Sequence, residues 1–271
     1  MTTLATKDLV KKVKETCLKL SHNTNASHLG GAFSIADVLA VLYIQILHYN
    51  TSEPKMPARD RLFYSKGHAC TALYATLKEV GFYDDAALQT FSQDGSMFTT
   101  HVNHKIPGIE LSTGSLGHAL SVSCGVALAG KRKNNSWHVF TILSDGELNE
   151  GSNWEAILFA PHHKLNNLTV IVDYNKIQSL GSVVDVLDLE PLSKKFESFG
   201  WEVTEINGHD HTAIFDALQK DKIHDSKPRV IIAHTIKGNG IDFMENQLVW
   251  HYKSPNKEQL ASAIAQIEAG K

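Results

Sequence analysis

The sequence reads Phe140-Thr-Ile-Leu-Ser-Asp-Gly-Glu-Leu-Asn-Glu-Gly151 near its centre and Leu168-Thr-Val-Ile-Val-Asp-Tyr-Asn-Lys-Ile-Gln178 a short distance later. In each segment an apolar, β-branched run, 139–143 or 168–172, leads to an aspartate, Asp145 or Asp173. Between the two runs, apolar residues recur at roughly helical spacing: Trp154, Ile157, Leu158 and Leu165. This pattern predicts a strand–helix–strand unit. Such units build parallel sheets, whose ligands bind beyond the carboxyl ends of the strands.

Two oxygen-bearing side chains follow these predicted strands. Asp145 and Asn175 supply a carboxylate and an amide, which are hard ligands suited to Mg²⁺ or Ca²⁺ and not to a soft metal. Gly146 has no Cβ, so the backbone can come close to whatever such an ion carries. An ordinary alternative exists, because Asp-Gly after a strand is usually a turn and Asp-x-Asn is common in loops. The rest of the chain has to decide between the two interpretations.

The composition excludes several classes of protein. With 271 residues, 42% of them hydrophobic, the chain can bury the core of one large α/β domain. Its 26 basic and 29 acidic residues give a net charge of −3, which offers no basic surface for nucleic acid. The cysteines, Cys17, Cys70 and Cys124, form no C-x-x-C pair and read as buried thiols of a reducing compartment. No signal peptide or membrane-spanning run is evident, so we expect a soluble, cytoplasmic protein.

Helical and strand patterns alternate along the chain. We expect helices over 4–21, 34–47, 190–199, 211–219 and 257–268, a helix from His68 to Leu77 and one from His118 to Gly130. Strands are expected over 60–64, 201–206 and 228–234, in addition to the central two. Ser34 and Asp37 would cap the second helix, and Asp210 the helix at 211. The alternation predicts a single α/β domain over 1–271, with a mainly parallel sheet flanked by helices on both faces.

Histidines gather at predicted junctions between loops and helices. His28, His68 and His101 each lie in a glycine-containing loop, and His118 opens a helix. Neutral imidazoles collected at the ligand edge of the sheet could bond a polyhydroxylated substrate and pass protons near neutral pH. They lack the cysteine and acidic partners of a zinc site. We interpret His162-His163 and His209-Asp-His211 as surface residues.

The segment 237–255 is glycine-containing and poorly periodic. It ends near an isolated Trp250-His251-Tyr252. A loop of this length in a compact domain tends to be a functional lid or a segment that orders on binding. We therefore expect it to be mobile until cofactor and partner are present.

Nearly the whole chain resembles the N-terminal, diphosphate-binding domain of transketolase. Seven blocks match in order: Ser27-His28-Leu-Gly-Gly, Asp60-Arg61…Ser65-Lys-Gly-His68-Ala, Pro107-Gly108…Thr113-Gly114-Ser-Leu-Gly117, Asp145-Gly146…Glu150…Trp154-Glu155-Ala, Asp173-Tyr-Asn175-Lys-Ile177, Lys237-Gly238-Asn-Gly240 and His251. The central pair of strands carries a form of the family's Gly-Asp-Gly…Asn motif. Ser144 replaces the first glycine, and His118-Ala119 stands where full-length members often carry Gln-Gly. We expect both departures to affect local packing more than chemistry.

The resemblance implies the following roles. The metal that bridges the diphosphate of thiamine diphosphate, Mg²⁺ or Ca²⁺, would be held by Asp145, Asn175 and the Ile177 carbonyl. Other residues at the cofactor would be His68, Gly114, Ser115, Leu116, Gly146, Glu147 and His251. Four histidines would surround the sugar hydroxyls and assist proton transfer: His28, His68, His101 and His251. Glu150 and Glu155 match the acidic residues that link paired active sites across the family's dimer interface.

A complete transketolase has a second, pyrimidine-binding domain that carries the glutamate needed to activate the cofactor. This chain begins at a methionine, ends in a predicted helix and contains no such domain. We therefore expect it to be the N-terminal subunit of a split transketolase, inactive alone and working with a C-terminal subunit in an α₂β₂ assembly. The implied reaction is reversible transfer of a two-carbon ketol unit from a ketose, expected to be a sugar phosphate, to an aldose.

Two other functions remain open on the sequence. One is a subunit of another two-subunit thiamine-diphosphate enzyme, of the 2-oxo acid decarboxylase or dehydrogenase type, which would need fewer hydroxyl partners than the histidines offer. The other is a non-catalytic regulatory subunit, which would not need to retain Asp145, Asn175 and the histidines.

Overall fold

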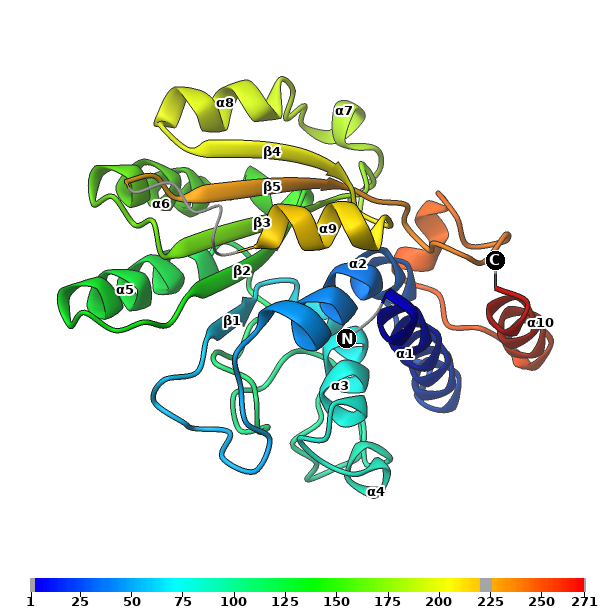
Figure 1. The fold of residues 1–271 in the computed structure, drawn as a ribbon. Helices are drawn as coiled ribbons and strands as arrows, with labels where there is room; N and C mark the ends of the chain where they lie inside the picture. The colour runs from blue at the N-terminus through cyan, green and yellow to red at the C-terminus, as the bar shows by residue number, and fades with distance from the viewer. Residues whose placement is uncertain (1–2, 220–225, 271) are drawn as a thin grey trace.

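The computed structural model describes residues 3–219 and 226–270 (Figure 1). Within these residues, five strands run in chain order: β1 (Arg61–Tyr64), β2 (Val139–Ser144), β3 (Leu168–Tyr174), β4 (Glu202–Asn207) and β5 (Arg229–His234). The α-helices are α1 (Thr3–Thr24), α2 (Leu29–Val41), α3 (Cys70–Glu79), α4 (Asp85–Leu88), α5 (Ala119–Arg132), α6 (Gly151–His162), α7 (Val183–Val186), α8 (Leu192–Phe199), α9 (His211–Leu218) and α10 (Lys257–Glu268). A π-helical turn, η1 (Leu42–Ile46), continues α2, and the 3₁₀ turns are η2 (Gly67–Ala69), η3 (Gly146–Asn149) and η5 (Leu248–His251).

The strands form one sheet in the order β1-β2-β3-β5-β4, and every neighbouring pair is parallel. The register aligns the strand ends, because Ser144 pairs with Asp173, and Asp173 pairs with Ala233. The chain therefore leaves β2, β3 and β5 at the same edge of the sheet, where the arrowheads point in Figure 1. The predicted α/β fold with a parallel sheet is confirmed.

Alternate strand residues enter two separate apolar layers. Side chains such as Phe140 and Ile142 pack in the layer that contains α1, α2, α3, α9 and α10. Their neighbours Val139 and Leu143 pack in the layer that contains α5, α6 and α8. A strand buried on both faces needs an apolar residue at nearly every position, which explains the continuous apolar runs of β2 and β3. The helices cover both faces of the sheet, as expected (Figure 1).

Helix α2 lies at the centre of the fold and is buried along its whole length. The 18-residue window Leu29–Ile46 has a mean hydropathy of 1.8, so length and composition alone would allow it to cross a membrane, contrary to the expectation from the sequence. In the structure 83% of the window is buried inside the protein, and a helix so enclosed leaves little surface for lipid. Its apolar character therefore belongs to the core.

Two local predictions need correction, and the structure describes the segment that a third concerns. Helix α2 begins at Leu29, and Ser34 lies inside it, where its hydroxyl bonds the carboxylate of Asp173 and does not cap a helix. On α6 the predicted apolar face is wrong at one position, because Leu158 is 61% exposed, whereas Ile157 and Leu165 are buried as expected and Ala160 joins them. The segment 237–255 is folded in the structure, with Met244 and Trp250 buried and η5 near its end. Its mobility in solution stays a prediction.

Capping residues mark the start or the end of three helices. Asp210 accepts hydrogen bonds from the backbone N–H groups of Thr212 and Ala213, which confirms the predicted cap of α9. Asn256 and Gln259 form a reciprocal capping box at the start of α10. Gly200 ends α8 with φ at 94°, a left-handed conformation that glycine adopts without steric cost.

Candidate functional site

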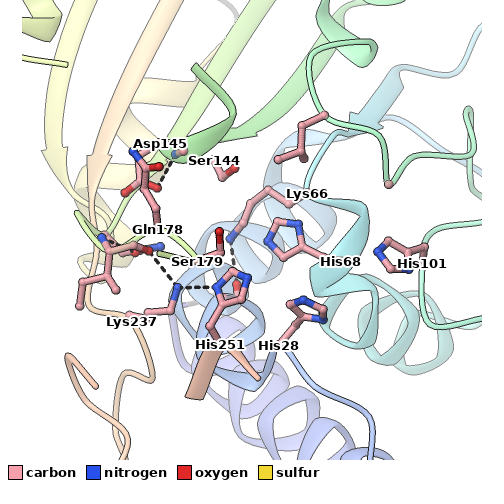
Figure 2. Close-up of a pocket in the computed structure, with 16 residues that line it drawn as sticks. His28, Lys66, His68, His101, Ser144, Asp145, Gln178, Ser179, Lys237 and His251 are labelled. Carbon is pink, nitrogen blue, oxygen red and sulfur yellow. Dashed lines mark hydrogen bonds between the residues drawn. The ribbon is translucent and has the colours of Figure 1, made fainter. Parts of the chain in front are cut away.

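A cavity of about 260 Å³ opens at the carboxyl edge of the sheet (Figure 2). Its walls come from segments far apart in the chain, since the loops after β1, β2, β3 and β5 all contribute, together with the loop before α2 and turn η5. The lining residues are His28, Gly31, Lys66, His68, His101, Gly114, Leu116, Ser144, Asp145, Gly146, Asn175, Ile177, Gln178, Ser179, Lys237 and His251. Parallel strands place their ligand-binding residues at this edge.

Three residues with oxygen ligands, Asp145, Asn175 and Ile177, line one wall of the cavity. Asp145, 2% exposed, accepts hydrogen bonds from the N–H groups of Gly146 at 2.7 Å and Lys176 at 2.6 Å. Asn175 Oδ1 lies 3.2 Å from the N–H of Ile177. Burial raises the pKa of Asp145 to about 6, with a further contribution from the charge of Asp173. A buried carboxylate in this state is stabilised by any cation that binds beside it.

Lys237 brings a positive charge to the same wall. Its Nζ donates to the carbonyl of Ile177 at 2.9 Å and lies 3.2 Å from Nδ1 of His251 (Figure 2). Burial lowers the pKa of Lys237 to about 8. The Ile177 carbonyl thus already accepts a hydrogen bond from a positively charged group, the ammonium of Lys237.

A second wall, which meets the first where His251 contacts Lys237, is made of imidazole rings. The ring of His28 lies 5.2 Å from that of His68, 6.1 Å from that of His101 and 4.9 Å from that of His251, between centroids. His28 adopts φ of 74°, a left-handed conformation that is uncommon outside glycine and that recurs at functional sites. Its N–H donates to the carbonyl of His251 at 3.0 Å, so the loop before α2 and turn η5 hold each other.

Three of these rings are neutral at physiological pH. Burial lowers the pKa of His28 to about 4 and of His251 to about 3, and the charge of Lys237 contributes to both shifts. Burial also lowers the pKa of His68 well below its ordinary value. A neutral imidazole has one donor and one acceptor nitrogen, so the cluster can both give and take hydrogen bonds from hydroxyl groups.

A buried ion pair supports the floor of the cavity. Lys66 and Asp173, 1% and 0% exposed, are in direct contact through Nζ and Oδ2. Lys66 also donates to the carbonyl of Gly31 at 2.8 Å, and Asp173 accepts from the hydroxyls of Ser34 and Thr235. Although burial acts to raise the pKa of Asp173, Lys66 and these hydroxyls together hold it below the ordinary value. The pair is therefore charged and its hydrogen-bonding groups are extensively satisfied, which a buried salt bridge requires.

Two glycines of the site leave no room for a side chain. A Cβ on Gly114 would lie 2.9 Å from Cδ2 of His101, and one on Gly67 would lie 2.3 Å from the carbonyl oxygen of Thr113. These close approaches bring the loop 101–117 against the turn that carries His68.

The family model "Transketolase, thiamine diphosphate binding domain" matches residues 5–266. The chain belongs to the transketolase family.

Transketolase relatives of similar length exist. The chain is 38% identical over 260 residues to one subunit of the apulose-4-phosphate transketolase of Actinobacillus succinogenes, covering 95% of this chain and 94% of that protein. It is 39% identical over 242 residues to a 6-deoxy-6-sulfo-D-fructose transketolase subunit of a Clostridium species, covering 89% of this chain and 88% of that one.

Solved transketolases have the same fold. The enzyme from Leishmania mexicana superposes with a TM-score of 0.91 and 28% identity, covering 97% of this chain but 41% of that one. The enzyme from Campylobacter jejuni gives a TM-score of 0.90 and 30% identity, covering 99% and 43%. This chain therefore corresponds to about two fifths of these transketolase chains.

The residues of the cavity fit the cofactor of the transketolase family. Asp145, Asn175 and the Ile177 carbonyl offer three oxygens, the ligand type that Mg²⁺ prefers. Gln178 points into the cavity, and its buried Nε2 has no hydrogen-bond partner among the described residues, which leaves a donor for an anionic group. Within residues 3–219 and 226–270, no group of three or more His, Cys, Asp or Glu side chains gathers as a metal site, so an ion here would depend on the amide and carbonyl oxygens.

Most of the predicted site residues line this one cavity. Two predicted cofactor residues do not. Ser115 is exposed outside it, and the buried carboxylate of Glu147 turns away to bond Ser65 and the N–H of Gly117. The Glu147 side chain therefore supports the loop of Gly117 from behind the cavity. Glu150 is exposed at the start of α6, and Glu155 is exposed along it.

Several polar residues were missed or misplaced by the sequence patterns. His211 is buried and His209 half-buried, and both bond the carboxylate of Asp37, so their interpretation as surface residues is wrong. Their partner lies 172 and 174 positions earlier in the chain, which no local pattern reveals. Lys66 and Lys237 lie in blocks that match the family, but no role was predicted for them. Their position two and three residues beyond the ends of predicted strands was the available signal.

Proposed function

We propose that this chain is the N-terminal subunit of a two-subunit transketolase that transfers a two-carbon ketol unit from a ketose to an aldose. The observation that carries this proposal is a single cavity in which an oxygen-lined wall faces four histidines. The names of the relatives in Actinobacillus and Clostridium support the two-subunit form, since each protein is called a subunit of its transketolase and is matched over most of its length.

The oxygen-lined wall would bind the diphosphate end of thiamine diphosphate. We assign the metal ligands to Asp145, Asn175 and the Ile177 carbonyl, with Mg²⁺ as the ion and Ca²⁺ as a substitute. Lys237 then leaves the carbonyl that it contacts now and can neutralise a diphosphate oxygen instead. When bound, the cofactor supplies the electron sink that allows a carbon–carbon bond beside a carbonyl to break and form.

The histidines would handle the sugar. Because His28, His68 and His251 are neutral, they can donate to one hydroxyl and accept from another without adding charge to the cavity. A ring that accepts the hydroxyl proton of the donor ketose assists bond cleavage, and returning it to the acceptor reverses the step. His101, which is exposed, lies at the outer end of the cluster, where an incoming aldose would meet it.

Exposed apolar side chains near the cavity suggest where the second subunit binds. Leu180 is 79% exposed and Val184 68% exposed, directly after cavity residue Ser179 in sequence. Val249, 54% exposed, and Tyr252, 59% exposed, flank cavity residue His251 in sequence. Apolar side chains gathered beside a polar cavity are typical of a protein interface. This rim would receive the subunit that carries the pyrimidine-binding domain.

A second apolar surface lies on the face of α5 and α6. Val122, Leu158 and Phe159 are 39%, 61% and 38% exposed, and the carboxylate of Glu155 lies on the same helix as the latter two. We propose that this surface joins two copies of the chain in an α₂β₂ assembly, with Glu150 and Glu155 between the paired sites. The three buried free thiols suit a reducing compartment, which supports a cytoplasmic location.

The substrates would be phosphorylated sugars or sugars with another acidic group. Relatives are named for apulose 4-phosphate and for 6-deoxy-6-sulfo-D-fructose, and both are ketoses with an anionic end. The cavity of this chain provides hydroxyl partners, whereas the contacts to the anionic end would come from the second subunit.

The test is reconstitution. Ketol transfer from xylulose 5-phosphate, apulose 4-phosphate and 6-deoxy-6-sulfofructose is measured with thiamine diphosphate and Mg²⁺, with this chain alone and with the product of the neighbouring gene. Activity confined to the mixture supports the proposal, and the preferred ketose identifies the substrate. Decarboxylation of pyruvate without ketol transfer would point to a 2-oxo acid enzyme. Absence of cofactor binding in the mixture, measured by calorimetry, would point to a regulatory subunit.

A further inference from the structure

A second polar cluster lies away from the cavity, between α2, α9 and the chain after β5. Asp37 on α2 is 7% exposed, and its two oxygens contact different histidines: Oδ2 lies 2.9 Å from Nδ1 of His209, and Oδ1 lies 2.8 Å from Nε2 of His211. Burial acts to raise the pKa of Asp37, but the two histidine hydrogen bonds outweigh it and hold the pKa below its ordinary value. The carboxylate is therefore charged, and both histidines donate to it.

The two histidines differ in their other ring nitrogen. Nδ1 of His211 lies 2.6 Å from the hydroxyl of Thr6 on α1, so His211 joins two helices of the core. Nε2 of His209 lies 2.8 Å from the backbone N–H of Ile236. Because a backbone N–H can only donate, Nε2 must be the acceptor, and the proton of the His209 ring is fixed on Nδ1, where it faces Asp37. The side-chain amide nitrogen of Asn239 lies beside this contact, 3.0 Å from Nδ1 and 3.4 Å from Oδ2 of Asp37, and since it can only donate, its acceptor is the carboxylate.

Ile236 is the residue before Lys237, whose ammonium group reaches into the cavity. On the other side of Lys237, the N–H of Gly238 donates to the carbonyl of Gly30 at 3.0 Å. The side chain of Lys237 then passes so close to Gly30 that a Cβ there would lie 3.0 Å from its Cγ. One residue further, the carbonyl of Asn239 accepts from Lys14 at 2.9 Å.

These contacts fix the backbone on both sides of Lys237. Among them, the bond to His209 is the one made by a side chain from outside the cavity to the residue immediately before Lys237. Without it, the N–H of Ile236 would be left without that acceptor in a region where His209 is half-buried and Asn239 part-buried. An unsatisfied buried donor favours any backbone arrangement that exposes it to water.

We infer that His209 is a positioning residue: through Asp37 on one side and Ile236 on the other, it holds the backbone of residues 236–239, and so aims Lys237 at the oxygen-lined wall. The inference rests on the proposed function only for what Lys237 is aimed at. The position of Lys237 also affects His251, because Lys237 Nζ contacts Nδ1 of the His251 ring. His211 shares the carboxylate but belongs to the helical core.

Amide hydrogen exchange of the full chain, followed by mass spectrometry, tests this inference without cofactor or partner. His209→Asn keeps a side-chain amide donor near Asp37 but is too short to accept from Ile236. His209→Gln places an amide oxygen close to where Nε2 lies now, so it can still accept from Ile236. His211→Asn is the matched control, because it disturbs the same carboxylate without contacting residue 236. Circular dichroism checks that each variant is folded.

We expect His209→Asn to exchange about tenfold faster than the parent in peptides that cover 235–251, while peptides of β1, β2 and β3 are unchanged. His209→Gln should restore most of the protection, and in His211→Asn these peptides should not be accelerated more than the peptides of β1, β2 and β3. Unchanged exchange in His209→Asn would overturn the inference. So would equal acceleration in the Asn and Gln variants, or acceleration spread evenly over the chain. None of these outcomes would count against the proposed function.

A second measurement tests whether the position that His209 gives to Lys237 affects the affinity for the cofactor. Calorimetry of thiamine diphosphate with Mg²⁺, on the assembled complex, should show affinity about tenfold weaker for His209→Asn and unchanged for His209→Gln. Equal affinity in the parent and His209→Asn would mean that residues 236–239 reach the same position without His209, and would overturn the link to Lys237. Absence of cofactor binding in the parent complex itself would instead count against the proposed function.

Discussion

The protein contains two groups of histidines that differ in how many of their hydrogen bonds are already made. The cavity histidines, His28, His68, His101 and His251, lie against one another, and each makes at most one side-chain hydrogen bond to another described residue. His209 and His211, here called the pinned histidines, form hydrogen bonds through both ring nitrogens. The first group keeps donors and acceptors for a ligand, whereas the second uses them to hold the fold.

Charged residues follow the same division. Lys66 and Asp173 lie at the floor of the cavity but satisfy each other, together with the hydroxyls of Ser34 and Thr235. Lys237 contacts a backbone carbonyl and a histidine, and its lowered pKa reflects burial that the nearby carboxylates only partly offset. Polar residues near a site are therefore best sorted by what they already bond, and each of the following variants tests that division.

The largest effect is expected from breaking the buried ion pair. Lys66→Met leaves the charge of Asp173 buried without its partner, which should lower the free energy of unfolding by about 3–5 kcal/mol in urea titrations. Lys194→Met is the control, because the Lys194–Glu197 pair has side chains 70% and 47% exposed, and its loss should change the free energy of unfolding far less. Replacing both partners, Lys66→Met with Asp173→Leu, should recover much of the loss. A loss in Lys66→Met as small as the control's would show that Asp173 is not held charged by Lys66.

Removing a cavity histidine should instead affect catalysis and spare stability. His101→Ala removes an exposed ring, so the free energy of unfolding should change by less than about 0.5 kcal/mol. Ketol transfer by the reconstituted complex should fall about a hundredfold, the lower end of what a positioned proton-transfer group contributes. His104→Ala, three residues away and also exposed, should leave the rate unchanged, because the His104 ring bonds Ser112 outside the cavity. If both variants were equally active, His101 would have no part in the reaction.

The strand ends were predictable because local patterns define them. The apolar runs of β2 and β3 are buried on both faces, so hydrophobicity alone identified them, and parallel pairing then brought Asp145 and Asn175 to one edge. His28, His68 and His101 were found for a similar reason, since each lies in a glycine-containing loop near a predicted helix, whereas the role of His251 was implied only by the family resemblance. Such signals lie within a few residues of the side chain concerned.

The pinned residues could not be found in this way. Asp37 and His211 are separated by 174 positions, and Lys66 and Asp173 by 107, so only the folded chain pairs them. Helix α2 shows the same limit. Its buried polar positions, Ser34 and Asp37, resemble a capping pair because both are polar and three residues apart, whereas in the structure each serves a distant partner. Spacing along the chain cannot distinguish these two uses.

A pinned histidine should contribute to stability more than an exposed one with the same type of partner. His211→Asn withdraws a donor from the buried carboxylate of Asp37, and the free energy of unfolding should fall by about 2 kcal/mol, as for hydrogen bonds to charged groups. The matched control is His234→Asn, because His234 bonds Glu205 at the same 2.8 Å but their side chains are 38% and 47% exposed. The control should cost about 0–1 kcal/mol. Equal losses would mean that burial does not separate the two pairs.

The smallest expected effect is the loss of folding stability that the cavity histidines cause as the pH falls. Burial lowers the pKa of His28 from 6.5 to about 4, so between these pH values the unfolded chain binds a proton that the folded chain refuses. Stability is therefore complete above about pH 6.5 and is lost as the pH falls, by at most about 1.4 kcal/mol per pH unit for one proton.

Urea titrations at pH 7 and pH 5 measure this loss. His28→Gln cannot take up a proton, so its stability should fall less between the two pH values than that of the parent. His162→Gln, at an exposed histidine, is the control for replacing one histidine by glutamine. His68, His101 and His251 face the same space, and Lys237 adds its charge, so part of the slope should survive in His28→Gln. A slope identical to the parent's would mean that the ring of His28 is solvated enough to titrate as it does in the unfolded chain, and that its unmade hydrogen bonds are already satisfied by water.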